Sequence, residues 1–356
     1  MCSIDGATWT AGAVKSDDPC RVCQPATSTT TWTPAGDGFS CGLGKACLSG
    51  TCAARTYRVA LVNQKAGGVD VVDFVVAGTP TVVRSLSMGW NSASPSPAWS
   101  ADGTQLAYPA GGSGLGSTYL FDVEAASTNW LDWMPAIHPD YAKERLRVVG
   151  NNALGQVVRW DGHGQTATTT IPGRTASRPK FDSSDSARFA FLDAASSSLA
   201  LHAGGSAAQV ADGVVDFGWR GAGGGLVVLR RQGTSCEVRA IAVTAGAPGA
   251  SSALASGADC TARLRVAPAG KLVALVRGAD VFVADGAGLV DLASATPTLT
   301  LDQPVLDADF TPDGTLLALL KGTPAYLYVV QPSAGAQPVA VTSGSYQGLR
   351  MSPSMH

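Results

Sequence analysis

Charged side chains return at two fixed positions before an apolar residue that recurs along the chain. The apolar residues are Phe181, Trp219, Val266, Phe310 and Met351. One position before them stand Lys180, Arg265, Asp309 and Arg350, and three positions before them stand Arg178, Asp216, Arg263 and Asp307. Side chains alternate between the two faces of a β-strand, so the eight charged side chains are predicted to point away from the apolar face. Because only 15% of the residues are charged, eight at matching positions are a concentration.

These eight residues support three hypotheses. They could form a polar funnel that binds a peptide, a carboxylate or a glycan. Opposite charges alternate among them, so they could instead pair with one another as salt bridges and need no ligand. Asp307 and Asp309 could hold Ca²⁺, because hard cations prefer clustered oxygen ligands. We treat the eight as candidate ligand-binding residues, and calcium is the one cofactor that they suggest.

No other pattern points to catalysis. The four histidines, His138, His163, His202 and His356, are far apart in the sequence. No Gly-x-Ser-x-Gly, His-Glu-x-x-His or phosphate-loop motif is present, and the glycine run at 221–225 is typical of a turn. We therefore expect no catalytic residue and a protein that is not an enzyme.

Composition excludes two classes of partner. The formal net charge of −2 and a pI near 6.1 give no electrostatic basis for binding nucleic acid or an anionic membrane surface. The longest apolar stretches are far shorter than the roughly 18 residues that a membrane helix needs. No signal-peptide pattern begins the sequence, so we expect any export signal or lipid anchor to lie outside it.

Three tryptophans are candidate contacts with a partner. Trp90, Trp130 and Trp133 lie just before two of the recurring segments described next. Exposed aromatic side chains often contact proteins or sugars. The alternative is that they pack against neighbouring loops.

The charged positions belong to a repeat. Similar segments, each a short strand, a turn rich in Asp, Gly or Pro and an aliphatic strand, centre on Trp99, Ile137, Phe181, Trp219, Val266 and Phe310, 38 to 47 residues apart. This spacing is the period of a four-stranded propeller blade. The charged residues would then lie on the innermost strands, around a common axis.

The two ends of this region complement each other. Residues 347–351, "QGLRM", read as an innermost strand, and residues 57–87 supply three strands that lack one. Joining them gives a seventh blade and a ring without a free edge between its first and last blades. The predicted fold is therefore all-β, a seven-bladed β-propeller with an interlocked closing blade, with six or eight blades as alternatives.

Two copies of the repeat carry a family resemblance. The segments "AWSADGTQLAY" and "DFTPDGTLLALL" resemble the WD40-like Pro-Asp repeat of TolB-type propellers, and the resemblance spans residues 57–356. It implies a platform for protein binding and nothing catalytic.

The cysteines divide the chain. Cys2, Cys20, Cys23, Cys41, Cys47 and Cys52 lie in a segment of almost no aliphatic content, which is too small for a hydrophobic core of its own. We expect three disulfides among the fifteen arrangements that six cysteines allow. A metal or redox role for Cys20 and Cys23, and a lipidated Cys2, are the alternatives. The segment resembles short cysteine-rich modules of bacterial cell-surface and secreted proteins.

The two remaining cysteines, Cys236 and Cys260, are predicted to pair with each other between adjacent strand ends. A chain with so many disulfides matures in an oxidising compartment. We therefore expect a secreted, cell-surface or periplasmic protein with a disulfide-rich module at 1–53 and a propeller at 54–356. Its expected function is non-catalytic binding of a protein partner, or self-assembly at the cell surface. The alternative is a carbohydrate-binding or enzymatic propeller with a ligand or metal in the funnel.

Overall fold

The computed structural model describes residues 1–37, 39–87, 97–110, 117–130, 139–142, 147–152, 155–162, 168–171, 176–182, 185–193, 195–221, 225–268, 272–284 and 290–354. Regular structure in these ranges is entirely β-strand. No helix in them is long and apolar enough to span a membrane. The all-β class predicted from the sequence is confirmed.

Residues 57–354 form a series of sheets, which in the described ranges are six antiparallel sheets of four strands and one sheet of five strands. The sheet that joins the two ends of this region has the order β10 (Thr81–Ser87), β9 (Gly68–Phe74), β8 (Tyr57–Asn63), β36 (Tyr346–Met351). The next three sheets are β11 (Ala98–Trp99), β12 (Gln105–Ala110), β13 (Ser117–Asp122), β14 (Ser127–Trp130); β15 (Asp140–Tyr141), β16 (Val148–Asn151), β17 (Val157–Trp160), β18 (Thr168–Ile171); and β19 (Ala176–Asp182), β20 (Asp185–Asp193), β21 (Ser198–Ala203), β22 (Ser206–Asp212). The last three are β23 (Val214–Trp219), β24 (Gly225–Gln232), β25 (Ser235–Thr244), β26 (Ala247–Ala258), β30 (Val290–Asp291); β27 (Arg263–Val266), β28 (Val273–Arg277), β29 (Asp280–Ala284), β31 (Leu299–Thr300); and β32 (Val305–Phe310), β33 (Leu317–Lys321), β34 (Ala325–Val330), β35 (Val339–Gly344).

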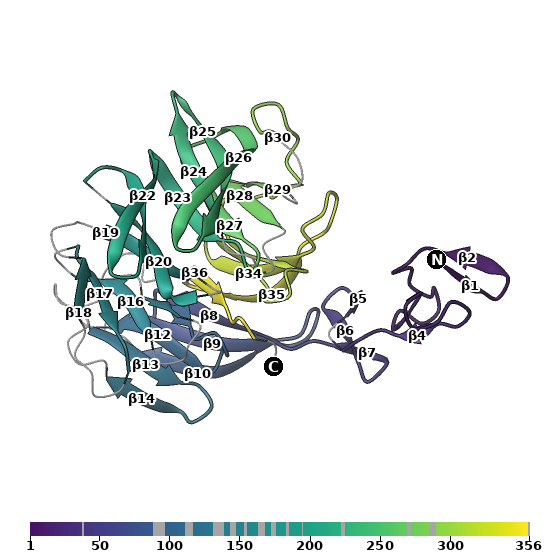
Figure 1. Ribbon diagram of the computed structural model, residues 1–356. Helices are drawn as coiled ribbons and strands as arrows, with labels where there is room; N and C mark the ends of the chain where they lie inside the picture. The colour runs from purple at the N-terminus through teal and green to yellow at the C-terminus, as the bar shows by residue number, and fades with distance from the viewer. Residues whose placement is uncertain are drawn as a thin grey trace.

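Burial explains the hydrophobic pattern of these strands. Strand β33, "LALLK", is buried at every position, because both faces of its sheet pack against neighbouring sheets. Every position of the outer strand β10 is exposed or half-buried. The sheets therefore surround a common centre, with the core between them (Figure 1).

The same turn joins the first two strands of two sheets that are far apart in the sequence. Asp102 Oδ1 accepts hydrogen bonds from the Ser100 hydroxyl (2.7 Å) and the Thr104 N–H (3.1 Å). Asp313 Oδ1 accepts the equivalent bonds from Thr311 (2.6 Å) and Thr315 (3.1 Å). In both turns the next residue is a glycine with φ near +70°, a conformation that disfavours other residues. The sequence similarity of the two segments thus reflects one shared turn geometry.

The C-terminal strand completes the first sheet. Met351 of β36 pairs with Val59 of β8, so that the end of the chain lies beside its start in the sheet region (Figure 1). This is the complementary pairing of the two ends that the sequence predicts.

The third segment of the repeat needs a correction. Ile137, the apolar position predicted for it, lies outside the described residues. The register instead places Tyr141 there: Tyr141 pairs with Val148 as Trp99 pairs with Leu106. Tyr141 follows Trp99 by 42 residues and precedes Phe181 by 40, which is more even than the predicted spacing. The Pro-Asp of "HPDY" resembles the turn of the other copies, which is why the sequence predicts Ile137. In the structure Asp140 is instead part of strand β15.

The cysteine-rich module, residues 1–53, consists of short strands and disulfides and extends away from the sheets (Figure 1). Its strands are β1 (Cys2–Ile4), β2 (Ala7–Trp9), β3 (Arg21–Val22), β4 (Thr33–Pro34), β5 (Ser40–Gly42), β6 (Lys45–Leu48) and β7 (Thr51–Ala54). Its disulfides are Cys2–Cys23, Cys20–Cys47 and Cys41–Cys52. One arrangement among the fifteen is thereby selected.

A buried ion pair joins the module to the sheets. The side chain of Arg55, just after β7, is 5% exposed and bonds to Asp313 in the turn after β32. The Tyr57 hydroxyl lies 3.3 Å from the same carboxylate. The connection between the two parts is therefore held by contacts far apart in the sequence.

The fourth disulfide links Cys236 on β25 to Cys260 after β26. The outer edge of β26 is also covered, because β30 pairs with it in parallel through Ala255 and Val290. Four disulfides in one chain indicate maturation in an oxidising compartment.

Candidate functional site in the central cavity

All eight charged candidates lie on edge strands of successive sheets. Arg178 and Lys180 are on β19, Asp216 on β23, Arg263 and Arg265 on β27, Asp307 and Asp309 on β32, and Arg350 on β36. These strands surround a cavity of about 410 Å³. Seven of the eight line it, and the half-buried Asp309 is not among the lining residues. Its walls are formed by Pro97, Ala98, Trp99, Pro139, Asp140, Arg178, Pro179, Lys180, Asp216, Arg263, Arg265, Asp307, Gln347, Gly348, Arg350, Met351 and Pro353.

The carboxylates connect each strand to the next sheet. Asp216 accepts a hydrogen bond from the Leu264 N–H of β27 (3.0 Å), and Asp307 accepts one from the Leu349 N–H of β36 (3.1 Å). Asp309 accepts one from the Met351 N–H (3.0 Å). These strands are the inner edges of their sheets, so their N–H groups need a partner that the sheet cannot supply. The carboxylates supply it.

The cations make the complementary contacts. Lys180 Nζ donates to the Phe217 carbonyl of β23 (2.6 Å), and Arg265 Nε donates to the Ala308 carbonyl of β32 (2.6 Å). Arg263 donates to the Leu306 carbonyl. Charged side chains of both signs thus join the inner edges of neighbouring sheets.

Asp307 is the centre of the ion pairs. Its side chain is 9% exposed and lies 2.6 Å from Arg265 Nη2 and 3.0 Å from Arg350 Nη1. Burial raises the pKa of this carboxyl, but the two guanidinium charges and the Leu349 N–H outweigh it and lower the pKa to about 2. Asp307 therefore forms salt bridges with Arg265 and Arg350, as in the salt-bridge hypothesis.

Asp307 and Asp309 do not fit a calcium site. The oxygens of Asp307 accept from the backbone N–H groups of Ala308 and Leu349 as well as from the two arginines. Those of Asp309 accept from the N–H groups of Phe310 and Met351. These donors compete with a cation for the carboxylate oxygens, and the positive charges of Arg265 and Arg350 act on both side chains and repel a cation.

Asp140 is a site residue that the sequence analysis missed. It occupies the position directly before Tyr141, and its Oδ2 accepts the Phe181 N–H at 2.7 Å. Burial raises its pKa to about 6, although the Phe181 N–H and the charges of Lys180 and Arg350 act in the opposite direction. The sequence signal for Asp140 is the aromatic residue after it: Tyr141 is more evenly spaced between Trp99 and Phe181 than Ile137 is.

Two arginines are less engaged than the rest. The side chains of Arg178 and Arg263 are 51% and 52% exposed, and their closest carboxylates lie 3.5 Å (Asp216) and 3.8 Å (Asp307) away. Arg178 also has a φ of +50°, at an irregularity in the pairing of β19 with β20 between Ser177 and Lys180. Non-glycine residues rarely adopt this conformation, and it is enriched at functional sites.

The tryptophan candidates are not part of this cavity as described. Trp90 and Trp133 lie outside the described residues, and Trp130 is described only by its backbone at the end of β14. Trp99 contributes the aromatic wall of the cavity instead, and its indole N–H donates to the Arg350 carbonyl at 3.0 Å. His202 is the one histidine in the described ranges; it is 4% exposed and stacks on Phe189.

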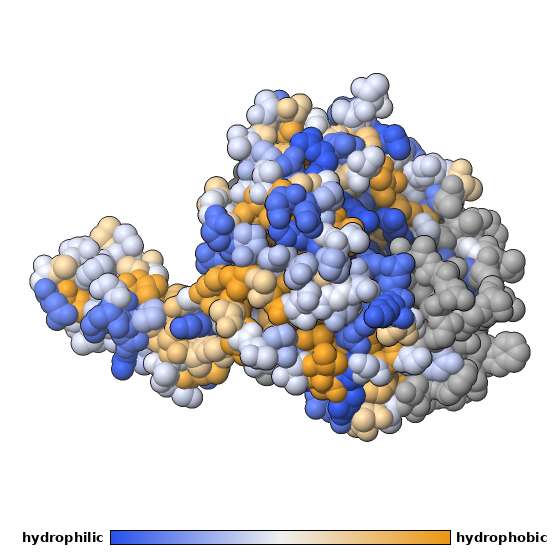
Figure 2. Space-filling view, turned by 180° about the vertical axis from the view of Figure 1, so that it is seen from behind, coloured by the Kyte–Doolittle hydropathy of each residue, from blue (hydrophilic) through white to orange (hydrophobic). Residues whose placement is uncertain are grey.

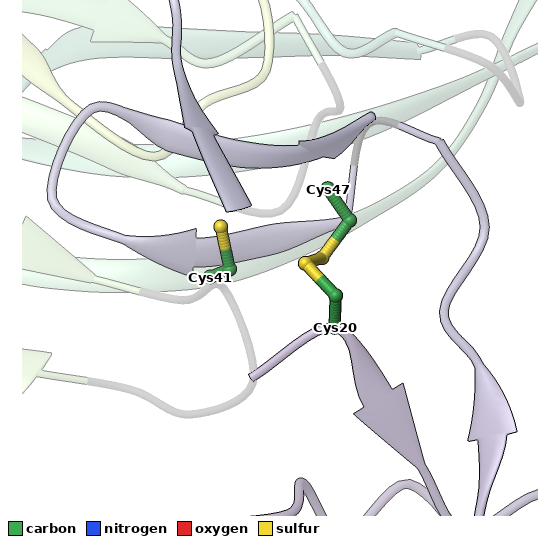
Figure 3. Close-up of side chains that lie close together, drawn as sticks. All are labelled: Cys20, Cys41 and Cys47. Carbon is green, nitrogen blue, oxygen red and sulfur yellow. A yellow bond between two sulfur atoms is a disulfide. The ribbon is translucent and has the colours of Figure 1, made fainter. Parts of the chain in front are cut away.

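A cluster of sulfur atoms in the module has the spacing of a metal site. The Sγ atoms of Cys20, Cys41 and Cys47 lie within 4.8 Å of one another (Figure 3). Figure 3 shows Cys20 and Cys47 joined to each other, and Cys41 is joined to Cys52. Metal-binding cysteines are thiolates, so in this disulfide-bonded form the sulfurs are not metal ligands.

Comparisons with known proteins reveal similarity of structure only. No protein-family model and no curated protein matches the sequence. An oligogalacturonate lyase in complex with manganese matches with a TM-score of 0.56 at 14% identity, over 78% of this chain and 90% of that chain. The β-propeller domain of Cps50 (Swd1) from Myceliophteria thermophila matches with a TM-score of 0.50 at 13% identity, over 71% and 87%. TolB from Acinetobacter baumannii matches with a TM-score of 0.49 at 14% identity, over 85% and 67%.

At these identities the likeness concerns the fold alone. The match to a β-propeller domain agrees with the series of four-stranded sheets in this chain. The β-propeller architecture that the sequence resemblance implies is thereby confirmed, and the chain is an all-β protein with a β-propeller fold and a disulfide-rich N-terminal region.

Proposed function

We propose that this chain is a non-catalytic binding or scaffold protein of the cell surface, the periplasm or the extracellular space. In this proposal the sheets are the seven blades of one propeller (residues 54–356), and the module (residues 1–53) is a separate domain that contacts a protein partner. The disulfides support the export of the chain. Most of the charged side chains in the central cavity are largely buried in ion pairs, which supports a stable platform.

The distribution of exposed apolar side chains carries the proposal. Seven large apolar side chains are exposed in the described ranges, and five of them belong to the module: Met1, Val14, Phe39, Leu43 and Leu48. The module is a small part of the chain, so this is a strong enrichment. Figure 2 shows hydrophobic side chains on the module and on the surface where it meets the propeller. Exposed apolar surface on a soluble protein is typical of contact sites.

Three of these side chains belong to one hairpin. Leu48 ends β6, Leu43 lies in the turn between β5 and β6, and the Phe39 carbonyl accepts the Cys47 N–H at 2.8 Å. The disulfides of Cys41 and Cys47 hold this hairpin against a small buried cluster with Val22 and Ala35, so the exposed apolar side chains of the hairpin are not needed for its core and are available to a partner. We propose that a protein, either another surface protein or a second copy of this chain, covers the hairpin.

Cross-linking and mass spectrometry on native envelopes under non-reducing conditions test this function. We expect cross-links from the module to one abundant protein or to other copies of the chain. The double variant Phe39→Ser, Leu48→Ser should lose them. Val82→Ser is the matched control, because Val82 is 56% exposed but lies on the propeller strand β10. A free, monomeric chain, or cross-links that survive the double variant, would contradict the proposal.

A second function is supported by one observation. The half-exposed Arg178 and Arg263 in the central cavity favour the binding of a small ligand there. This deepens the alternative of a carbohydrate-binding or otherwise ligand-binding propeller and is developed next.

A further inference from the structure

We infer that the central cavity binds a carboxylate-bearing small molecule or chain end through the guanidinium groups of Arg178 and Arg263. This site is independent of the module surface proposed above. It follows from the charge balance of the cavity, the state of the two arginines and the shape of the remaining wall.

The described cavity wall has more positive than negative groups. Five cationic side chains line it (Arg178, Lys180, Arg263, Arg265 and Arg350), against three carboxylates (Asp140, Asp216 and Asp307). Each of these carboxylates already accepts a backbone N–H from a neighbouring strand. Asp309, next to the lining, adds a fourth carboxylate that interacts with Arg265 and Arg350. Five cationic groups still face four carboxylates among the described residues, and an anion that entered would restore the balance.

Arg178 is poised for such an anion. Its ion-pair partner at 3.5 Å is Asp216. The two carboxylate oxygens of Asp216 accept hydrogen bonds from the N–H groups of Phe217 and Leu264. The guanidinium of Arg178 makes no hydrogen bond within the described part of the chain, so its fork of N–H donors remains available. A planar guanidinium binds a carboxylate through two parallel hydrogen bonds. The left-handed backbone at Arg178, which costs free energy, is explained if it directs this side chain into the cavity.

Arg263 provides the second donor. Within the described ranges it makes one side-chain hydrogen bond, to the Leu306 carbonyl, and it lies 3.8 Å from Asp307, whose oxygens accept from closer donors. Arg265 and Arg350 differ, because both make direct contacts of 3.0 Å or less with Asp307. The available cationic groups are therefore the two arginines that stand three positions before the recurring apolar residue.

The rest of the wall indicates the size and character of the ligand. Four prolines (Pro97, Pro139, Pro179 and Pro353) and Trp99 present rigid, largely apolar surfaces to the same cavity. A cavity of about 410 Å³ is within the range of small-molecule sites. These features fit a carboxylate on a compact ring or on the last residues of a chain. The two sources of that chemistry are the C-terminus of a peptide and a uronic acid.

Calorimetric titration of the full-length, disulfide-bonded protein at low ionic strength tests the inference. The probes are an N-acetylated Gly-Pro dipeptide with a free carboxylate, the same dipeptide as its C-terminal amide, and glucuronic acid. We expect saturable binding of at least one of the two carboxylates, with a dissociation constant of about 1 mM or tighter, and none of the amide. Binding of the dipeptide alone identifies a peptide terminus as the source, and binding of the uronic acid alone identifies a sugar acid.

Variants link the binding to the two arginines. Arg178→Gln and Arg263→Gln should each weaken binding of the carboxylate about tenfold or more, because each removes a charged hydrogen-bond donor. Arg21→Gln is the matched control: Arg21 is 45% exposed and has a similar loose ion pair, 3.6 Å from Asp18, but it lies in the module. Arg178→Lys keeps the positive charge but loses the paired N–H donors of the guanidinium, so this variant should bind the carboxylate with intermediate affinity.

Thermal unfolding of each variant guards against a folding defect. Arg178 makes one loose ion pair, so Arg178→Gln should unfold within a few degrees of the wild type. The inference is overturned if neither carboxylate binds, if the amide binds as well as the acid, or if Arg178→Gln and Arg263→Gln bind the carboxylate as tightly as Arg21→Gln does.

Discussion

The carboxylate of Asp307 on β32 receives the Leu349 N–H of the C-terminal strand at 3.1 Å, together with the guanidinium groups of Arg265 and Arg350. One buried side chain thus joins three successive sheets, β27, β32 and β36. The strand that closes the propeller is held to its neighbour by this carboxylate and by Asp309.

Replacement of Asp307 should destabilise the propeller more than replacement of any exposed carboxylate. Asp307→Ala removes the carboxylate that two partly buried guanidinium groups and two backbone N–H groups contact, so we expect a loss of about 3 kcal/mol in the free energy of unfolding. Denaturant unfolding measures it. Asp212→Ala, at an exposed position, should change the free energy by less than about 0.5 kcal/mol. Equal effects of the two substitutions would show that the network contributes nothing to stability.

Asp307 also predicts a contribution to acid stability. Its pKa is about 2 in the folded chain, against 3.8 for an aspartate side chain free in water, so its contribution is complete above about pH 4. It is lost as the pH falls from 4 toward 2. In Asp307→Asn this part of the acid dependence should be absent, which unfolding curves at pH 2.5, 4 and 6 would reveal.

Asp140 predicts the opposite pH dependence. Its pKa of about 6 lies above the reference value of 3.8, so the folded chain binds the extra proton between pH 4 and 6. Stability contributed by the neutral form is therefore lost as the pH rises from 4 to 6, by at most about 3 kcal/mol. Asp140→Asn cannot ionise, and its stability relative to the wild type should grow over this interval. A constant difference between pH 4 and pH 7 would contradict the assignment.

The Cys236–Cys260 disulfide should stabilise the sheet that contains β25 and β26. The bond spans 24 positions in the sequence, which in the chain-entropy model corresponds to about 3 kcal/mol. The double variant Cys236→Ala, Cys260→Ala should unfold at a lower denaturant concentration than the wild type by the equivalent amount. Under reducing conditions the difference between the two proteins should disappear; if it persists, lost packing rather than the cross-link explains the effect.

Arg55 should determine how firmly the module is attached. Arg55→Gln removes the ion pair with Asp313 and leaves the module disulfides unchanged. We expect faster cleavage by a non-specific protease between residues 53 and 57, and intact module and propeller fragments. Lys15→Gln is a suitable control, because Lys15 pairs only with exposed Asp17 inside the module. Cleavage at the same rate in wild type and Arg55→Gln would indicate that the junction is held by its backbone contacts.

Local patterns in the sequence were sufficient for the architecture. The Asp-Gly turns at Asp102 and Asp313 form because a carboxylate and a left-handed glycine close the same turn wherever they occur, so their recurrence was visible without any long-range information. The apolar strands and the complementary ends followed from periodicity in the same way. Alternation along a strand is a local rule, and it predicted seven of the charged residues that line the central cavity.

The tertiary structure decided what local rules do not specify. Which carboxylates are occupied depends on neighbours 40 or more residues away, such as Leu349 for Asp307, and those contacts exist only after the sheets are placed side by side. The same is true of the pairing of the six module cysteines and of Asp140, whose position became clear only from the register of Tyr141 with Val148. Residue type and spacing therefore predicted a ring of charged side chains. Only the packing of one sheet on the next shows which of them connect the sheets, and that Arg178 and Arg263 remain available to a ligand.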